Sequence, residues 1–225
     1  TALLSSLSHD LRTPLTAIRG AAETLTTPGI ALTGTSRADL LASIVQDVGR
    51  MTRFLANITG MARIETGEIV ARREPVALAP LIEAAVARVP EAFHAAVNLG
   101  PGADAVIADP ALLEQVLVNL LENAVKYAPD GSAITIAART GDSVIAISVA
   151  DEGIGIAAED LAHVFDSFFR AARGDRVAPG TGLGLAIARA FVEAMGGTIA
   201  AASPRPDLPR DGMPGTIITV RLPAA

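Results

Sequence analysis

Cysteine and tryptophan are both absent from the 225 residues, and aromatic residues make up only 3% of the chain. Without cysteine the chain has neither disulfides nor thiolate metal sites, and it suits a reducing compartment. The scarcity of aromatic residues, beside abundant alanine, favours closely packed helices over a β-sandwich. The formal net charge is −6 and no basic stripe is present to meet phosphates, which argues against nucleic acid as a partner.

Long apolar runs and a signal peptide are also missing, so the sequence contains no candidate membrane span. The three histidines, His9, His94 and His163, are too scattered to indicate a metal site. The chain begins within a helical pattern and without methionine, so we expect it to be a segment of a longer protein. Half of the residues are apolar, which is enough for two modest domains, each with a core.

The first stretch predicts a helix that ends at about Thr26 and carries a histidine on its surface. Its apolar residues recur every three or four positions, as in a bundle helix: Leu4, Leu7, Leu11, Leu15, Ile18, Ala22 and Leu25. His9 lies about 200° around the helix from its neighbours in this seam, so it faces outward, and Thr13 follows one turn later. Asp10 adjoins the imidazole, and Pro14 predicts a bend. The ordinary alternative is a solvated surface histidine, but this does not explain why Asp10, Thr13 and Pro14 lie beside it.

A second helix is predicted after a Pro-Gly break, with Ser36 as its N-cap and an end near Gly67. Its seam has the same spacing: Leu41, Ile44, Val48, Met51, Leu55, Ile58 and Ala62. A lone hairpin cannot cover both seams, so we expect residues 1–67 to form a homodimeric four-helix bundle. The alternative is that the hairpin packs against the rest of its own chain.

After a polar linker over residues 68–77, the pattern predicts a second domain over residues 78–225. Helices are expected at 78–89, 110–127, 159–163 and 185–195, and strands at 105–108, 133–139, 143–150, 198–202 and 216–222. Asp109 and Pro110 are typical of a helix start. These elements lack a βαβ rhythm, so the predicted fold class is α+β, with helices on one face of a sheet.

The helix over 110–127 carries an unusual polar stripe. Asn119, Asn123 and Tyr127 lie four residues apart, and Lys126 adjoins them. Asparagine oxygens suit a hard cation such as Mg²⁺, and a lysine can meet phosphate as a point charge. An ordinary solvated polar face explains the stripe about equally well.

Two later stretches could contact a nucleotide base and phosphates. Asp151 ends an apolar strand, where its carboxylate could accept a hydrogen bond from an exocyclic amine such as that of adenine, and Gly153 and Gly155 allow close backbone approach. Next, Phe165 and Arg170 bound a segment rich in phenylalanine that precedes a loop of arginines and small residues, which fits a lid over phosphates. A glycine-rich turn and a solvated surface loop are the alternatives.

The last candidate stretch leads directly into a helix and reads Gly180, Thr181, Gly182, Leu183 and Gly184. Glycines at a helix start expose backbone N–H groups, and the positive end of the helix dipole favours an anion. The order of residues differs from that of a Walker A loop and of a dinucleotide-binding fingerprint. The stretch therefore predicts a phosphate-binding helix start of another kind.

Taken together, these stretches resemble a known family. Ser8–Leu15 resembles the H-box of the dimerisation and phosphotransfer domain of bacterial sensor histidine kinases. The later stretches follow the order of the N, G1, F and G2 boxes of the GHKL ATPase superfamily, in the version found in histidine kinases. The resemblance implies an ATP-binding domain of the GHKL (Bergerat) type over residues 78–225.

In that family, His9 would be the phosphoacceptor, Asp10 would orient and deprotonate it, and Thr13 would position water for the phosphatase reaction. Asn123 would hold Mg²⁺ with ATP, and Asp151 would contact the adenine amine. The other expected nucleotide contacts are Asn119, Lys126, Tyr127, Gly153, Gly155, Phe165, Arg170, Gly180, Thr181, Gly182, Leu183 and Gly184.

Two stretches, Ser5–Pro14 and Leu112–Ala124, look most like KdpD-type potassium-responsive sensor kinases. This finer resemblance implies the cytoplasmic portion of an inner-membrane sensor and a response regulator that controls a potassium-uptake operon. We therefore expect ATP-dependent autophosphorylation of His9 followed by transfer to an aspartate of that regulator. The alternatives are a chaperone-like GHKL ATPase that drives a conformational change, and a dimeric scaffold that binds ATP without turning it over.

Overall fold

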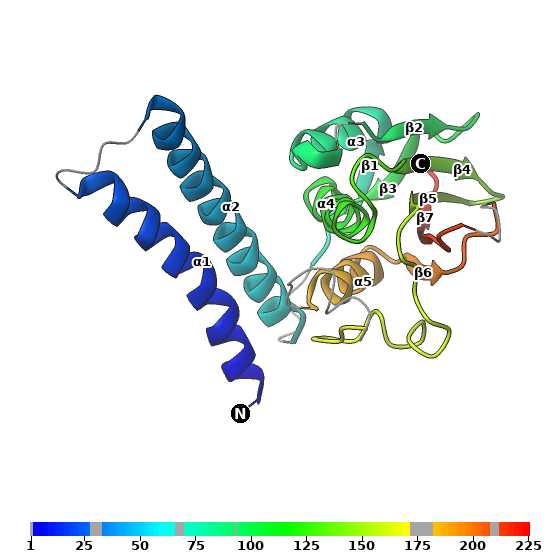
Figure 1. The fold of residues 1–225 in the computed structure, drawn as a ribbon. Coiled ribbons are helices and arrows are strands. Elements are labelled where there is room, and N and C mark those ends of the chain that lie inside the picture. Colours follow the sequence, from blue (N-terminus) through cyan, green and yellow to red (C-terminus); the bar gives the residue numbers. More distant parts are fainter. Residues whose placement is uncertain (1, 28–32, 66–69, 93, 172–181, 208–211) are drawn as a thin grey trace. The chain divides into compact units, whose positions relative to one another are not determined.

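The computed structural model of the protein describes residues 2–27, 33–65, 70–92, 94–171, 182–207 and 212–225. Within these ranges, only the backbone is described at 2–13, 50, 53, 54, 56–58 and 60–65. The chain divides into two compact units, Thr1–Glu65 and Thr66–Ala225 (Figure 1). The expected boundary at residue 67 and linker over 68–77 stay predictions. No helix in the described part of the chain is both long enough and apolar enough to span a membrane.

The first unit is a hairpin of two long helices, α1 (Ala2–Thr26) and α2 (Gly34–Glu65). Helix α1 continues through Pro14. Helix α2 begins two residues before the predicted cap Ser36, because Thr33 takes the capping role instead. The Thr33 hydroxyl accepts the N–H of Ser36 at 3.1 Å, and its carbonyl accepts the N–H of Arg37 at 3.0 Å. The predicted helix end at Gly67 lies outside the described residues.

Within one chain, several of the seam residues whose side chains are described stay about half exposed. The exposed fractions are 50% for Leu15, 51% for Leu41 and 55% for Leu55, whereas Ala21 is only 7% exposed. Burying a leucine side chain fully stabilises a fold by about 1.5–3 kcal/mol. The exposed leucines are therefore a substantial unburied apolar surface along the hairpin.

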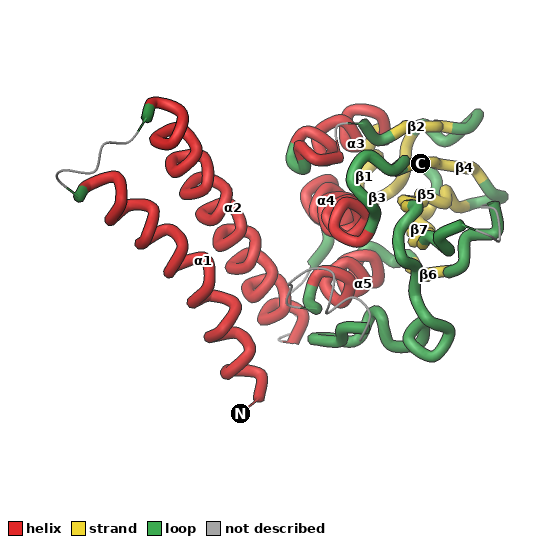
Figure 2. The backbone as a smooth tube through the Cα atoms, viewed as in Figure 1, coloured by secondary structure: helices red, strands yellow, loops and turns green. Residues whose placement is uncertain are grey.

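The second unit has a helical layer on one face of a sheet (Figure 2). The five-stranded sheet has the order β2-β4-β5-β7-β6. Its strands are β2 (Ala96–Leu99), β4 (Thr135–Thr140), β5 (Val144–Asp151), β7 (Thr216–Pro223) and β6 (Thr198–Ala202). The pair β2 and β4 is parallel, and the other pairs are antiparallel. The predicted α+β class is thus confirmed.

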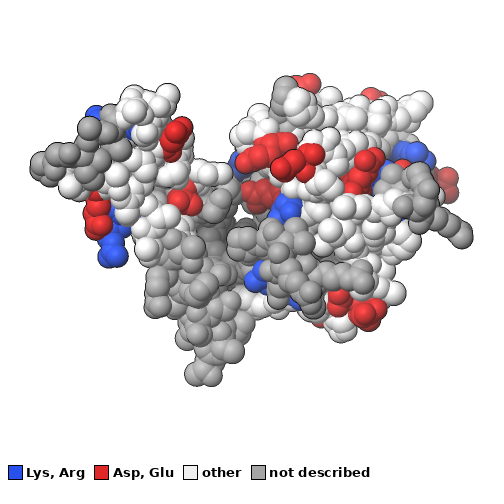
Figure 3. Space-filling model, viewed as in Figure 1, with Lys and Arg blue, Asp and Glu red and all other residues white. Residues whose placement is uncertain are grey.

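Three helices form the layer on the sheet: α3 (Leu78–Ala87), α4 (Pro110–Tyr127) and α5 (Gly184–Ala194). Helix α4 is central and buries Leu113, Leu117 and Leu121 almost completely. Asp109 caps it as predicted, since its Oδ1 accepts the N–H groups of Ala111 at 3.0 Å and Leu112 at 3.2 Å. Acidic side chains gather over the side formed by α3 and α4 (Figure 3), in keeping with the negative net charge.

Four local features differ from expectation. Strand β1 (Glu74–Ala77) lies in the predicted polar linker and pairs with β3 (Ala105–Ala108), because Val76 is buried there. Strand β2 and the 3₁₀ turn η1 (Pro90–Ala92) were not predicted; β2 is an edge strand whose four residues are all exposed, so it has no apolar alternation. The helix predicted over 159–163 is wrong: this segment forms turns. A segment of that length forms too few hydrogen bonds to offset helix nucleation.

Candidate functional site

The polar stripe of α4 faces the start of α5. Asn119 is 3% exposed, and its Nδ2 donates to the Gly184 carbonyl at 3.2 Å while its Oδ1 accepts from Gln115 Nε2 at 3.3 Å. One turn later, Asn123 is half-buried, and its Nδ2 lies 3.8 Å from where a Cβ on Gly184 would be. The structure therefore brings the two asparagines and the glycine-rich helix start together. Of the two asparagines, Asn119 already has both ends of its amide bonded to the protein.

The last turn of α4 carries the predicted lysine and tyrosine. Lys126 Nζ lies 4.7 Å from the centre of the Tyr127 ring, within the range of a cation–π contact. The Tyr127 carbonyl accepts the N–H of Ile154 at 3.3 Å. This bond ties the end of α4 to the glycine loop that follows β5.

Asp151 is the last residue of β5, and it is buried, with 8% of the residue exposed. Its Oδ1 accepts the N–H of Gly153 at 2.8 Å. Burial raises the pKa of Asp151, while the backbone N–H groups of Gly153 and Thr216 and the charge of Arg205 act to lower it. A carboxylate shielded from water in this way accepts a hydrogen bond from a ligand amine more strongly than one in bulk solvent.

The two glycines of this loop are required by the packing of the protein itself. A Cβ on Gly153 would collide with the Tyr127 carbonyl oxygen and with Oδ1 of Asp151. Gly155 has φ +68°, and a Cβ there would lie 2.5 Å from Pro214 Cγ and 2.7 Å from Ser203 Oγ. Backbone and side chains from three separate segments thus converge on the loop after Asp151.

The segment before β7 completes the site, and the sequence alone did not point to it. Ser203 Oγ donates to the Gly215 carbonyl at 2.7 Å and accepts the N–H of Ile156 at 3.0 Å. The N–H of Gly215 donates to the Gly153 carbonyl at 3.0 Å. Thr216, which is buried, pairs with Asp151 across β5 and β7. The only signal in the sequence was that Thr216, a polar residue, begins an apolar strand, and this signal is weak.

The phenylalanine-rich stretch packs against the start of α5. Phe165 and Arg170 are both half-buried. Phe168 has φ 65°, and its N–H donates to the Gly182 carbonyl at 3.0 Å. Gly182 has φ +69°, and a Cβ there would lie 2.6 Å from the Phe169 carbonyl oxygen. This contact fixes the backbone immediately before α5.

Gly180 and Thr181 lie outside the described residues, and α5 begins at Gly184 with the apolar Leu183 in its N-cap position. The positive end of the helix dipole lies at this start and favours an anion. His9, Asp10 and Thr13 lie in α1, and their side chains are outside the described residues.

These groups fit a purine nucleotide with phosphates. A buried carboxylate matches an exocyclic amine, the Asn123 amide and Lys126 ammonium suit a cation and phosphate, and the start of α5 suits an anion. Among the described residues, no three His, Cys, Asp or Glu side chains are grouped to hold a metal ion.

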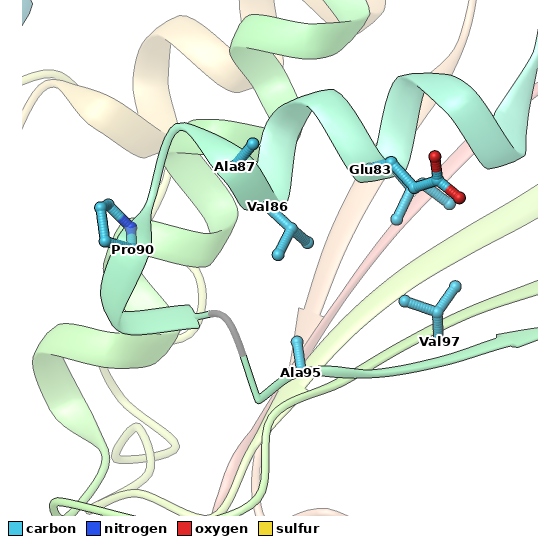
Figure 4. A pocket seen from close by; sticks show the side chains of 7 residues that line it. Glu83, Val86, Ala87, Pro90, Ala95 and Val97 are labelled. Carbon is cyan, nitrogen blue, oxygen red and sulfur yellow. The ribbon is translucent and has the colours of Figure 1, made fainter.

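A separate apolar pocket of about 500 Å³ lies between α3 and β2 (Figure 4). It is lined by Ile82, Glu83, Val86, Ala87, Pro90, Ala95 and Val97. None of the site residues predicted from the sequence lines this pocket. It is therefore not part of the candidate nucleotide site.

Parts of the chain match known proteins in sequence. Residues 1–67 match the family model of the His Kinase A (phospho-acceptor) domain. The chain is 41% identical over 202 residues to the sensor protein KdpD of Escherichia coli K12, covering 89% of this chain and 22% of that one. It is 39% identical over 216 residues to KdpD of Mycobacterium tuberculosis H37Rv, covering 88% and 24%. The chain thus spans about a quarter of the length of these relatives.

Solved structures share the fold. Full-length ShkA in complex with AMPPNP superposes with a TM-score of 0.64 at 26% identity, covering 99% of this chain and 45% of that one. The histidine kinase ThkA in complex with the response regulator protein TrrA gives 0.67 at 19% identity, covering 100% and 62%. Residues 108–225 match the family model described as histidine kinase-, DNA gyrase B-, and HSP90-like ATPase. The chain therefore belongs to this ATPase family and, because a His Kinase A domain precedes the ATPase domain, to its histidine kinases.

Proposed function

We propose that the chain is the catalytic core of a two-component sensor kinase that phosphorylates itself on His9 from ATP and passes the phosphoryl group to an aspartate of a response regulator. The observation that carries this proposal is the buried carboxylate of Asp151 at the end of β5, in the same unit as the polar stripe of α4, which is bonded to the start of α5. The carboxylate suits a purine amine, and the positive end of a helix dipole suits a polyphosphate. ShkA, a relative of the same fold, was solved with AMPPNP.

The phosphate end of the site would use Asn123, Lys126 and the start of α5. Asn123 would supply an oxygen ligand to Mg²⁺, which would neutralise phosphate charge. Lys126 would meet a phosphate oxygen as a point charge. The Asn119 amide would act indirectly, because its bond to the Gly184 carbonyl sets where α5 begins.

The chemical step uses the imidazole of His9. A neutral ring has a nitrogen lone pair at physiological pH. This nitrogen forms a bond to the γ-phosphorus while the bond from that phosphorus to the β–γ bridging oxygen breaks, and ADP leaves. Asp10 would accept the proton of the other ring nitrogen. Such general-base catalysis raises a reaction rate by about 10²–10⁴-fold. Thr13 would position water for dephosphorylation of the receiver, which releases inorganic phosphate.

The exposed leucines of α1 and α2 favour a homodimer through residues 1–67. Leu15, Leu41 and Leu55 are each about half exposed in the single chain. A second copy of the hairpin would cover both seams in a four-helix bundle. ThkA was solved with a response regulator, and we propose a receiver domain as the partner of this chain too. By its likeness to KdpD, we also propose that the chain is the cytoplasmic portion of an inner-membrane sensor of potassium supply.

The test is phosphorylation of the purified chain with γ-³²P-labelled ATP and Mg²⁺. We expect label on the wild-type chain that acid removes and alkali preserves, and none on His9→Ala. His94→Ala is the matched control and should label normally, since His94 is an exposed residue of the second unit. Acid-stable label, or undiminished label on His9→Ala, would refute the proposal.

A further inference from the structure

The side chain of Arg205 lies inside the second unit, although arginine is seldom fully buried. It is 8% exposed. Burying a charge costs several kcal/mol unless close partners compensate it, so arginines at such positions have specific contacts. The contacts of Arg205 therefore indicate its role.

Asp207 orients the Arg205 guanidinium through a two-pronged pair. Arg205 Nε donates to Asp207 Oδ1 at 3.1 Å, and Nη2 donates to Oδ2 at 2.5 Å. A forked pair of this kind fixes the plane of the guanidinium as well as its position. The remaining nitrogen, Nη1, donates to the backbone carbonyl of Asp151 at 3.2 Å. The pair with Asp207 thus directs one arginine donor at the last residue of β5.

The backbone around Arg205 is held against the same loop. The N–H of Arg205 donates to the Pro214 carbonyl at 2.8 Å. On either side, Ser203 holds Ile156 and Gly215 holds Gly153. The side chains of Arg205 and Ser203 and the backbone of Gly215 therefore all bind the backbone of residues 151–156.

We infer that Arg205 is a positioning residue for base recognition, which holds the backbone of Asp151 so that its carboxylate meets the exocyclic amine of adenine. The inference rests on the proposed function, because it takes Asp151 to be the adenine contact. The carboxylate belongs to the same residue as the backbone carbonyl that Arg205 binds. Without the bond from Arg205, the backbone of Asp151 could move and its carboxylate could turn. The preference for a base with an exocyclic amine would then fall more than the affinity for the phosphates.

The experiment compares ADP with inosine diphosphate, which has a carbonyl oxygen where adenine has its amine. Dissociation constants are measured by calorimetry with Mg²⁺ on the 225-residue chain. A hydrogen bond to a charged group predicts that the wild type binds ADP about 10- to 100-fold more tightly. Arg205→Met keeps the apolar stem, and we expect it to reduce this ratio by about threefold or more, mainly through weaker ADP binding.

Arg88→Met is the matched control. Arg88 pairs with Glu114 at 2.9 Å, and its side chain is half exposed. The same substitution there should leave both dissociation constants unchanged. Asp207→Asn provides a milder test, because Asp207 is exposed and asparagine keeps only one uncharged acceptor oxygen, so the two-pronged pair with Arg205 is lost. We expect an ADP preference between those of the wild type and Arg205→Met.

The outcomes separate the inference from the proposed function. A wild type that binds both diphosphates equally contradicts the adenine site itself, and the inference with it. A wild type that prefers ADP, with the same preference in Arg205→Met, overturns the inference alone. An equal loss of affinity for both diphosphates also overturns it, since that is the result of a purely structural role. If Arg205→Met does not fold by circular dichroism, an unchanged preference in Asp207→Asn overturns it.

Discussion

Asn119 Nδ2 donates a hydrogen bond to the carbonyl oxygen of Gly184 across 3.2 Å, joining the middle of α4 to the first residue of α5. The two residues are 65 positions apart in the sequence. Because Asn119 is 3% exposed, this bond is shielded from water. The helix start expected to meet phosphates is thus fixed by a side chain of the neighbouring helix.

We expect Asn119→Ala to weaken both folding and nucleotide binding. Removing the amide leaves the Gly184 carbonyl without this donor, which lowers the free energy of unfolding by about 1–2 kcal/mol. The affinity for ADP should fall as well, because α5 is no longer held at its start. Urea unfolding followed by circular dichroism and calorimetry with ADP measure the two effects. Asn98→Ala, on the exposed strand β2, is the control. Unchanged ADP affinity in a folded Asn119→Ala would contradict this role.

A second prediction concerns Gly182, where backbone angle and crowding act together. Its φ of +69° disfavours a side chain by about 1–2 kcal/mol, and a Cβ would lie 2.7 Å from the Phe168 carbonyl carbon. We expect Gly182→Ala to lose ADP affinity, because the backbone before α5 must move. Binding is measured by calorimetry and folding by urea unfolding.

Gly131 is the control for Gly182, since it has φ +76° and no atom of the described residues lies within 4 Å of the place that a Cβ would take. Gly131→Ala carries the cost of the backbone angle alone. If both variants lose the same stability and neither loses ADP affinity, then crowding at Gly182 has no bearing on the site.

Local signals allowed the sequence to predict most elements of the second unit and several residues of its site. Asp109 and Pro110 marked the start of α4, and the run ending at Gly184 marked the start of α5. The contacts that sequence reasoning missed join distant segments. Arg205 binds the backbone of Asp151, 54 positions away, and a repeat pattern in the sequence cannot predict such a contact. Asn119 shared a stripe with Asn123, but only the fold shows that α5 covers the first and leaves the second half-buried.

The hairpin offers a third prediction, on association. Leu41 belongs to the predicted seam of α2 and is 51% exposed in the single chain. If a second copy covers it, Leu41→Glu places a charge in an apolar interface, and we expect the dimer to dissociate. Sedimentation velocity measures the mass of the particle. Gln46→Glu adds the same charge at an exposed position outside the seam and should leave the dimer intact. A wild type that sediments as a monomer, or a dimer that survives in Leu41→Glu, contradicts the predicted bundle.

The last prediction concerns the pH dependence set by Asp151. Burial raises its pKa above the ordinary 3.8, so between the two values the folded chain binds more protons than the unfolded chain. By linkage, the contribution of this carboxyl to stability is present at lower pH and is lost as pH rises through its folded pKa. Nucleotide binding has the opposite sign, because the adenine amine needs the ionised carboxylate.

We therefore expect the ADP affinity of the wild type to fall on acidification while the pH is still above 3.8. Arg205 lowers the pKa of Asp207, so that carboxyl stays ionised in this window and does not contribute. Asp151→Asn should bind ADP weakly at every pH, and its free energy of unfolding should lack the component that declines as pH rises. Calorimetry and urea unfolding over the same pH series measure both. An ADP affinity that stays constant until ordinary carboxyls protonate would show that Asp151 does not contact the base, because binding and titration would then be uncoupled.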